Sequence, residues 1–245
     1  FALDRWNELP VFSSQSDTRT LLKAFNRQYN QYNKLKIMLK NNLISILDQA
    51  FPGVNTLFNT PARKKDGHEK WIDFVLKFPH CDCISRKSYS VFSKCYLSWC
   101  RKYGYYFYET KAKEVYAFAC NCAPSLVDSE AAHALVSTAI LQLNTLNETL
   151  AALQKEMDLL ASTLPEYDTV MSLYGVGSVL CSQLIAEIGD VSRFTNKKAL
   201  IGFAGIDAPP FQSGNFNPQS RSISKRGSAA LRKTLFQIMD SLIKR

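Results

Sequence analysis

The segment between Val127 and Leu164 carries the feature that most limits how this chain can fold. Apolar residues recur there at alternating steps of four and three, without an internal proline or glycine: Ala132, Val136, Ala139, Leu143, Leu146, Leu150, Leu153, Met157, Leu160 and Leu164. This period predicts one apolar stripe on a long α-helix, and its length predicts a coiled coil or a long helical hairpin. The stripe can pack within the chain, but its length favours a partner helix from a second copy. Pro165 ends the helix.

A second long helix is predicted from Asp17, which with Thr18 offers an N-cap, to about Ala50, before Pro52-Gly53. Its polar face is either a solvated surface or one that approaches a nucleic-acid backbone. The basic residues on that face are Arg27, Lys34, Lys36 and Lys40.

Shorter helices are expected at 68–78, 88–103 and 110–122. The middle one carries an aromatic stripe that either stacks on bases or, as the preferred interpretation, belongs to the core: Tyr89, Phe92, Tyr96, Trp99 and Tyr103. The fold class is therefore expected to be mainly α.

Composition excludes a disordered chain and a membrane span. The chain has 245 residues with 46% hydrophobic residues, and no apolar run approaches the ~20 residues of a membrane helix. Without a secretory signal, we expect a cytoplasmic protein. The chain opens Phe-Ala-Leu-Asp-Arg-Trp without an initiating Met, so we expect a fragment whose beginning lies elsewhere.

Seven cysteines in a chain of this length do not indicate a disulfide framework. Cys81 with Cys83, and Cys120 with Cys122, form two Cys-x-Cys pairs, and His80 precedes the first. Zinc sites usually have two or more residues between paired ligands, so reduced thiols are the favoured interpretation and a metal site the alternative.

Positive charge is concentrated in the last quarter of the chain. From Val191 onward there are ten Lys and Arg residues and two acids, a net charge of +8 out of +9 for the whole chain. A concentrated basic segment predicts a polyanionic partner, most simply nucleic acid. The alternative is a basic face that serves solubility.

The stretch from Ala199 to Phe236 combines groups that suit a phosphodiester. Ser213 stands beside Gly214 in a polar loop, and Lys225 and Arg226 come shortly before a predicted helix start. Glycine permits close backbone approach, and a helix N-terminus attracts phosphate. The alternative for Ser213 is an ordinary turn serine.

The run Leu173-Tyr-Gly175-Val-Gly177, followed by a helix of small and apolar residues, is typical of a helix-hairpin-helix. In that motif, backbone N–H groups at the start of the second helix contact DNA phosphate without reading sequence. A dinucleotide-binding loop fits poorly, because no strand precedes the glycines and no third glycine follows at the required spacing. A plain helical turn is the other alternative.

Several blocks in order resemble one family: Leu173-Tyr-Gly-Val-Gly, Ala186-Glu-Ile-Gly-Asp-Val-Ser-Arg-Phe, Leu200-Ile-Gly-Phe-Ala-Gly-Ile-Asp, Gln212-Ser-Gly, and Ile223-Ser-Lys-Arg-Gly-Ser-Ala-Ala-Leu-Arg. They resemble the C-terminal domain of the bridge-RNA-guided insertion-sequence transposases of the insertion sequence 110/1111 type, over about residues 165–245. The earlier half is similar more loosely.

The resemblance implies an organisation in four parts. Residues 1–50 would be a connector and long helix ending a RuvC-like α/β domain that is mostly missing, and 51–126 a helical middle region. Residues 127–164 would be the coiled coil, and 165–245 the transposase domain with the helix-hairpin-helix and serine loop.

The resemblance also implies chemistry and partners. Ser213 matches the serine that attacks DNA, and Lys225, Arg226 and Gly227 match a basic block. The residues themselves add the hairpin glycines Gly175 and Gly177, and Arg221 and Arg232 as further holders of the phosphate, to the expected DNA-binding set. The family acts with a structured guide RNA, as dimers or tetramers formed through the coiled coil. Its Mg²⁺ is held by four acids of the RuvC-like domain. The acids near the start of this chain, Asp4, Glu8 and Asp17, lack that spacing, so the Mg²⁺ ligands are expected to lie outside this chain.

Two other classes of function remain. The chain can be a non-catalytic helix-hairpin-helix module, or an inactive transposase remnant, that only binds DNA. It can also be a helical scaffold joined through its heptads, for which salt-insensitive or absent nucleic-acid binding would be the evidence.

Overall fold

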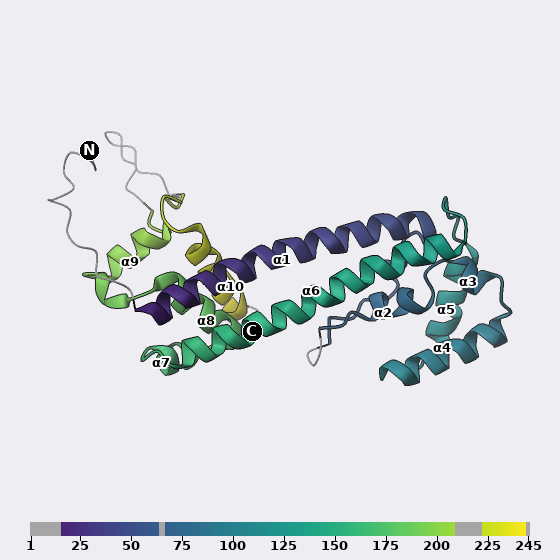
Figure 1. The fold of residues 1–245 in the computed structure, drawn as a ribbon, viewed down its shortest axis with the longest axis horizontal. Coiled ribbons are helices and arrows are strands. Elements are labelled where there is room, and N and C mark those ends of the chain that lie inside the picture. The colour runs from purple at the N-terminus through teal and green to yellow at the C-terminus, as the bar shows by residue number, and fades with distance from the viewer. Residues whose placement is uncertain (1–15, 64–66, 209–221, 244–245) are drawn as a thin grey trace. The chain divides into compact units, whose positions relative to one another are not determined.

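The computed structural model describes residues 16–63, 67–208 and 222–243, and this part of the chain is helical with no strand. Figure 1 shows the helices in chain order. They are α1 (Asp17–Ala50), α2 (Lys70–Lys77), α3 (Asp82–Ser85), α4 (Tyr89–Tyr103), α5 (Glu109–Cys120), α6 (Glu130–Ser162), α7 (Tyr167–Met171), α8 (Ser178–Ile188), α9 (Lys197–Ala204) and α10 (Ala229–Ile243), with 3₁₀ turns η2 (Val54–Thr56) and η3 (Val191–Arg193). The mainly α fold class is confirmed.

The chain divides into two compact units. The first unit comprises Phe1–Asn30 and Ala151–Arg245, and the second comprises Gln31–Leu150. The long helices α1 and α6 each contribute residues to both units.

The apolar stripe of α6 is buried within the chain in each unit. In the second unit, Val136 and Leu143 of α6 share a core with Leu43 of α1. In the first unit, Met157 of α6 shares a core with Leu22 of α1. The two long helices predicted from periodicity are therefore confirmed as elements, and residues of both helices share a core in each unit. A coiled coil with a second copy stays a prediction.

The core of the second unit is aromatic. On α4, Phe92, Tyr96 and Trp99 are buried, and the rings of Tyr96 and Trp99 stack with centroids 5.4 Å apart. The Trp99 indole N–H donates to the carbonyl of Asp73 on α2 at 3.1 Å. The aromatic stripe of α4 thus serves the core, as preferred from the sequence.

Helix α8 lies at the centre of the first unit. Its residues from Cys181 to Glu187 are all buried, and it packs on α7 and α10. The buried Glu187 carboxylate accepts a hydrogen bond from Asn26 of α1 at 2.7 Å. Arg19 of α1 donates to the Gly189 carbonyl at 2.9 Å and pairs with Glu166. The residue before α7 and the residue after α8 are therefore both bonded to the start of α1. Within the described residues, no helix combines the length and apolar composition needed to span a bilayer.

Candidate nucleic-acid interface

The chain leaving α9 and the chain entering α10 are bonded to each other. The Asp207 carbonyl accepts from the Ser224 N–H at 2.8 Å, and the Asp207 carboxylate accepts from the Ser224 hydroxyl at 2.5 Å. The Lys225 N–H donates to the Gly205 carbonyl at 3.0 Å. We call these paired segments, residues 203–207 and 224–228, the loop clamp. It closes the base of the loop between them.

Two glycines allow the segments of the loop clamp to come this close. Gly205 ends α9 in the left-handed conformation, with φ 65°, and a Cβ there would lie 2.6 Å from the Gly227 nitrogen. A Cβ at Gly227 would lie 2.1 Å from the Phe203 carbonyl oxygen, which accepts a hydrogen bond from Ser228 at 2.7 Å. Gly227 was predicted to contact DNA; the structure shows it in backbone packing, and DNA contact there stays a prediction.

The loop clamp exposes two of the basic residues predicted from sequence. Lys225 and Arg226 are both exposed, and Lys225 adopts a left-handed backbone conformation with φ 55° that residues other than glycine rarely take. Their turn leads directly into α10, where the Ser228 hydroxyl accepts from the Leu231 N–H at 3.2 Å and caps the helix. Two cations thus stand beside a helix N-terminus, and both features attract phosphate.

Arg232 has a different position. Its Nη1 donates to the Ala204 carbonyl at 3.0 Å, so its charge lies at the C-terminal end of α9, where a helix dipole favours a cation. Arg232 therefore stabilises the loop clamp, and its contact with DNA stays a prediction. Ser213 and Arg221 lie outside the described residues.

The two hairpin glycines between α7 and α8 differ in their surroundings. Gly175 has φ 79°, and a Cβ there would lie 3.3 Å from the Cβ of Ser241 on α10. Gly177 directly precedes α8, and a Cβ there would meet nothing within 4 Å. Of the pair, Gly177 has the open space that a phosphate needs. The arrangement is helix, hairpin and helix, and the DNA-binding role of this hairpin stays a prediction.

Arg193, at the end of η3, was not singled out from the sequence. Its guanidinium lies 4.6 Å from the ring centroid of Phe194 and 4.5 Å from that of Phe203. Its Nε and Nη2 atoms are buried and have no hydrogen-bond partner in the part of the chain that the structure describes. Phe203 is also a residue of the loop clamp, so these unused donors lie next to it. An arginine directly before a phenylalanine was the only signal in the sequence, because Phe203 is ten positions away.

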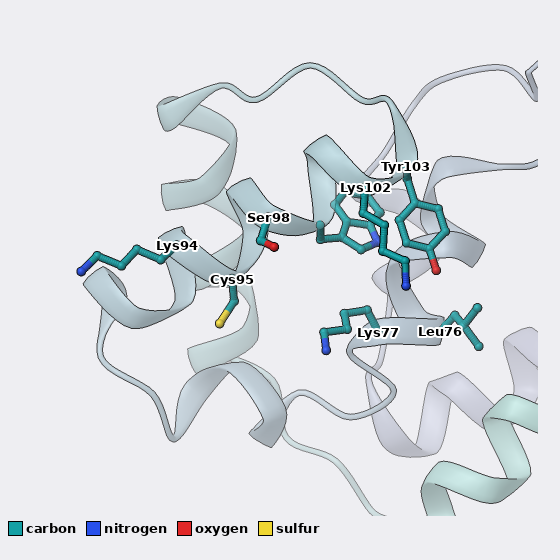
Figure 2. Close-up of a pocket in the computed structure, with 8 residues that line it drawn as sticks. Leu76, Lys77, Lys94, Cys95, Ser98, Lys102 and Tyr103 are labelled. Carbon is teal, nitrogen blue, oxygen red and sulfur yellow. The ribbon is translucent and has the colours of Figure 1, made fainter.

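The second unit has a separate basic pocket of about 630 Å³. Lys77 of α2 and Lys94 and Lys102 of α4 line it, with Trp99 and Tyr103 among the remaining residues. Figure 2 shows Lys77 and Lys102 near Tyr103, with Lys94 at the other end. Burial, with a smaller effect of the Asp73 carboxylate, raises the pKa of Tyr103. Lys94, Ser98 and Lys102 follow one another at steps of four and therefore share one helix face, a signal in the sequence that was missed.

A family model matches the part of the chain that contains α7 to α10. The family is described as Transposase IS116/IS110/IS902, and the match covers residues 167–245. It therefore includes the hairpin, the loop clamp and the loop that carries Ser213. A comparison with curated proteins gave no match.

Proposed function

We propose, from the premise that residues 167–245 are a transposase domain of the IS116/IS110/IS902 family, that this chain cleaves and rejoins DNA with Ser213 as nucleophile. The family match supports a DNA transposase or recombinase. The observation that carries the finer proposal is the loop clamp, which holds Lys225 and Arg226 at the base of the serine loop.

Covalent geometry links the serine to these cations. Six peptide units join Ser213 to Asp207, and at most about 3.6 Å per residue keeps the two within roughly 22 Å. Asp207 is itself bonded to Ser224, the residue before Lys225. A phosphate held by Lys225, Arg226 and the start of α10 is therefore within reach of the serine loop.

The proposed reaction is a reversible phosphoryl transfer. The Ser213 oxygen forms a bond to a DNA phosphorus and gives its proton to a base, while the bond from phosphorus to one deoxyribose oxygen breaks. That leaving oxygen takes up a proton, and the reverse sequence rejoins the DNA. Such transfers depend mainly on positioning and charge neutralisation, which arginine and lysine supply.

The described residues do not fit the Mg²⁺ that the family uses. Groups of three ligand-type side chains in this part of the chain contain cysteine and histidine, whereas Mg²⁺ requires oxygen ligands. We therefore assign no step on this chain to Mg²⁺. Its ligands would belong to the acid tetrad of a RuvC-like domain.

We further propose that a structured guide RNA contacts the lysine pocket of the second unit. Lys77, Lys94 and Lys102 offer three positive charges on one surface, and the half-buried Tyr103 supplies an aromatic ring beside them. Lysine-lined grooves with aromatic residues suit a nucleic-acid backbone and its bases. We also propose that the protein assembles as dimers or tetramers.

The test compares Ser213→Ala with Ser162→Ala, a change at an exposed helix-end serine. The assay uses the protein that carries this chain, with guide RNA and Mg²⁺. Ser213→Ala should keep DNA affinity and lose strand cleavage by at least about 100-fold, since no other nucleophile replaces the hydroxyl. A nicked substrate should trap a covalent adduct on Ser213 in the wild type and in Ser162→Ala.

Unchanged cleavage in Ser213→Ala, or an adduct on another residue, would overturn the proposal.

The second candidate function is that of a non-catalytic helix-hairpin-helix module or an inactive remnant. The open space at Gly177, directly before α8, favours DNA binding by this hairpin with or without catalysis. DNA binding without any cleavage by the wild type would support this candidate.

A further inference from the structure

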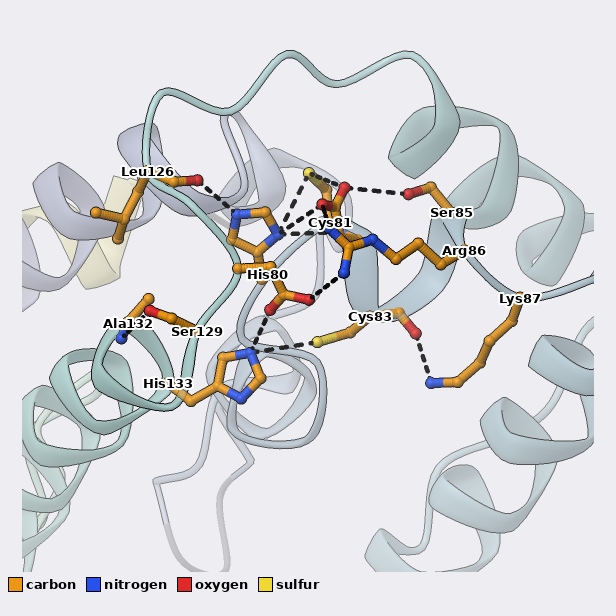
Figure 3. Close-up of polar contacts among 12 residues, drawn as sticks. His80, Cys81, Cys83, Ser85, Arg86, Lys87, Leu126, Ser129, Ala132 and His133 are labelled. Atoms are coloured by element: carbon orange, nitrogen blue, oxygen red, sulfur yellow. Dashed lines mark hydrogen bonds and ion pairs between the residues drawn. The ribbon is translucent and has the colours of Figure 1, made fainter.

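Three side chains of the second unit converge on one point far from the loop clamp in sequence. Cys83 is on α3, Asp128 directly precedes α6, and His133 is in the first turn of α6. The Cys83 Sγ lies 3.6 Å from the His133 Nε2, and the same Nε2 lies 2.7 Å from the Asp128 Oδ1. Their ligand atoms all lie within 4.8 Å of one another. Figure 3 shows the Cys83 thiol pointing toward the His133 ring.

This geometry differs from that of a nucleophilic cysteine. In a Cys-His-Asp relay, the carboxylate holds one ring nitrogen and the thiol contacts the other. Here the thiol and the carboxylate both approach Nε2. One N–H can serve only one of them well, whereas a cation placed between the three atoms would bind all of them.

The spacing agrees with tetrahedral zinc. Zinc–sulfur and zinc–nitrogen bonds of about 2.3 and 2.05 Å at a tetrahedral angle place the two ligand atoms about 3.6 Å apart. The Sγ to Nε2 distance is 3.6 Å. The nitrogen and oxygen ligands would be about 3.3 Å apart, so the 2.7 Å contact between Nε2 and Oδ1 has to open by roughly 0.6 Å.

Neighbouring groups orient the ligands. The Asp128 Oδ2 lies 3.4 Å from Arg86 Nη1, and Arg86 Nη2 lies 2.7 Å from Asp82. This contact leaves Oδ1 directed at His133. The Ser129 hydroxyl accepts from the Ala132 N–H at 3.2 Å and caps the helix turn that presents His133. Such outer contacts are typical of metal sites in which the ligand side chains are held before binding.

The adjacent residues His80 and Cys81 are less suited to bind metal. The His80 Nε2 lies 2.9 Å from the Leu126 carbonyl, to which it can only donate, and Nδ1 accepts from the Asp82 N–H at 3.1 Å. Both ring nitrogens are therefore used, and the side chain is fully buried. His133 instead has a side chain 38% exposed, beside an Asp128 side chain that is 16% exposed, which leaves room for a water ligand.

We propose that Cys83, Asp128 and His133 bind one Zn²⁺ ion, with water as the fourth ligand. Thiolate, imidazole and carboxylate together suit zinc better than Mg²⁺ or Ca²⁺. Binding releases the Cys83 thiol proton to solvent, and the imidazole proton moves from Nε2 to Nδ1. The ion joins α3 to the first turn of α6, two segments 50 positions apart in sequence.

The test uses the full chain, stripped with a chelator and then dialysed against buffered Zn²⁺, with bound metal measured by mass spectrometry. We expect one Zn²⁺ per wild-type chain and a higher Tm with the metal. Cys83→Ser and His133→Ala should each weaken binding by on the order of 100-fold. Cys120→Ser, which changes an exposed cysteine, should bind as the wild type does. Co²⁺ in the wild-type chain should give a thiolate-to-metal absorption band and the visible spectrum of a four-coordinate ion.

Three results would overturn the proposal. They are less than about a tenth of an ion per wild-type chain at micromolar free Zn²⁺, a Co²⁺ spectrum without the thiolate band, and loss of binding in Cys81→Ser but not in Cys83→Ser. The Co²⁺ spectrum is recorded on the wild type, so it decides the matter even where a variant fails to fold. A failure here would leave the proposal for Ser213 untouched, because the residues are separate.

Discussion

At Gly227 the space available for a side chain decides which residues the loop clamp can accept. A Cβ would lie 2.1 Å from the Phe203 carbonyl oxygen and 2.5 Å from the Gly205 nitrogen, and both neighbours are backbone atoms. The backbone of the loop clamp is held here by the hydrogen bond from the Ser228 N–H to the Phe203 carbonyl. Any residue larger than glycine therefore has to separate the two segments.

We predict that Gly227→Ala lowers the free energy of unfolding of the first unit by about 2–3 kcal/mol, as overpacking against fixed neighbours does. The matched control is Gly202→Ala in α9, where a Cβ meets nothing within 4 Å. Alanine in a helix interior should be neutral or stabilise by up to about 1 kcal/mol. Urea unfolding measures both variants, and equal stability of the two would contradict the clamp geometry.

At the scale of the element, the residues of α8 from Cys181 to Glu187 are buried, so their polar groups lie in a low-dielectric environment. Cys181 is fully buried. Burial, with a smaller effect of the Asp158 carboxylate, raises the pKa of the Cys181 thiol from 9.0 to about 11. The folded state therefore keeps the thiol protonated at a pH where the unfolded chain has lost the proton.

The sign of the pH effect follows from this raised pKa. The contribution of Cys181 to stability is complete below pH 9 and is lost as the pH rises from 9 towards 11. We predict a smaller decline of the free energy of unfolding over this range in Cys181→Ala than in the wild type, by up to roughly 3 kcal/mol. The control is Cys120→Ala, which removes an exposed thiol. Denaturant unfolding at several pH values tests this, and parallel curves for wild type and Cys181→Ala would refute it.

For the whole molecule, the distribution of charge matters more than its total. The net charge is +9, and the segment from Val191 onward holds +8 of it. The lysine pocket shows that the second unit also presents cations on one surface. Each unit thus presents clustered cations by itself.

We predict that DNA affinity falls steeply between 50 and 200 mM salt, because phosphate contacts release counterions. Changing Lys225 and Arg226 together to Gln should reduce the slope of log K against log salt by about 1–2, at roughly 0.9 per contact. The control is Lys155→Gln, at an exposed lysine of α6. Fluorescence anisotropy with labelled duplex measures the slopes. If the double variant keeps the wild-type slope, the loop clamp is not part of the DNA interface.

Local sequence patterns were sufficient to predict most of the helices. The 3.6-residue period, with Pro52-Gly53 after it, predicted a helix to about Ala50, and α1 ends at Ala50. The predicted N-cap was late in the sequence, because Asp17 already belongs to α1 and the Ser16 hydroxyl accepts from the Arg19 N–H at 3.4 Å. The apolar stripe of α6 and the aromatic stripe of α4 were also identified as buried surfaces, because burial of one helix face follows from spacing alone. The basic pair and the helix start after it were likewise predicted, since they are neighbours in sequence.

Partners distant in sequence were decided only by the tertiary structure. The amino-acid sequence determined that the chain would be helical, where most helices begin and end, and that its positive charge would gather near the C-terminus. It did not determine that Arg232 caps α9, that Arg193 stacks on Phe203, or that Cys83 meets His133. Helix spacing is set by neighbouring residues, whereas these contacts depend on how separate helices pack, and packing involves the whole chain at once.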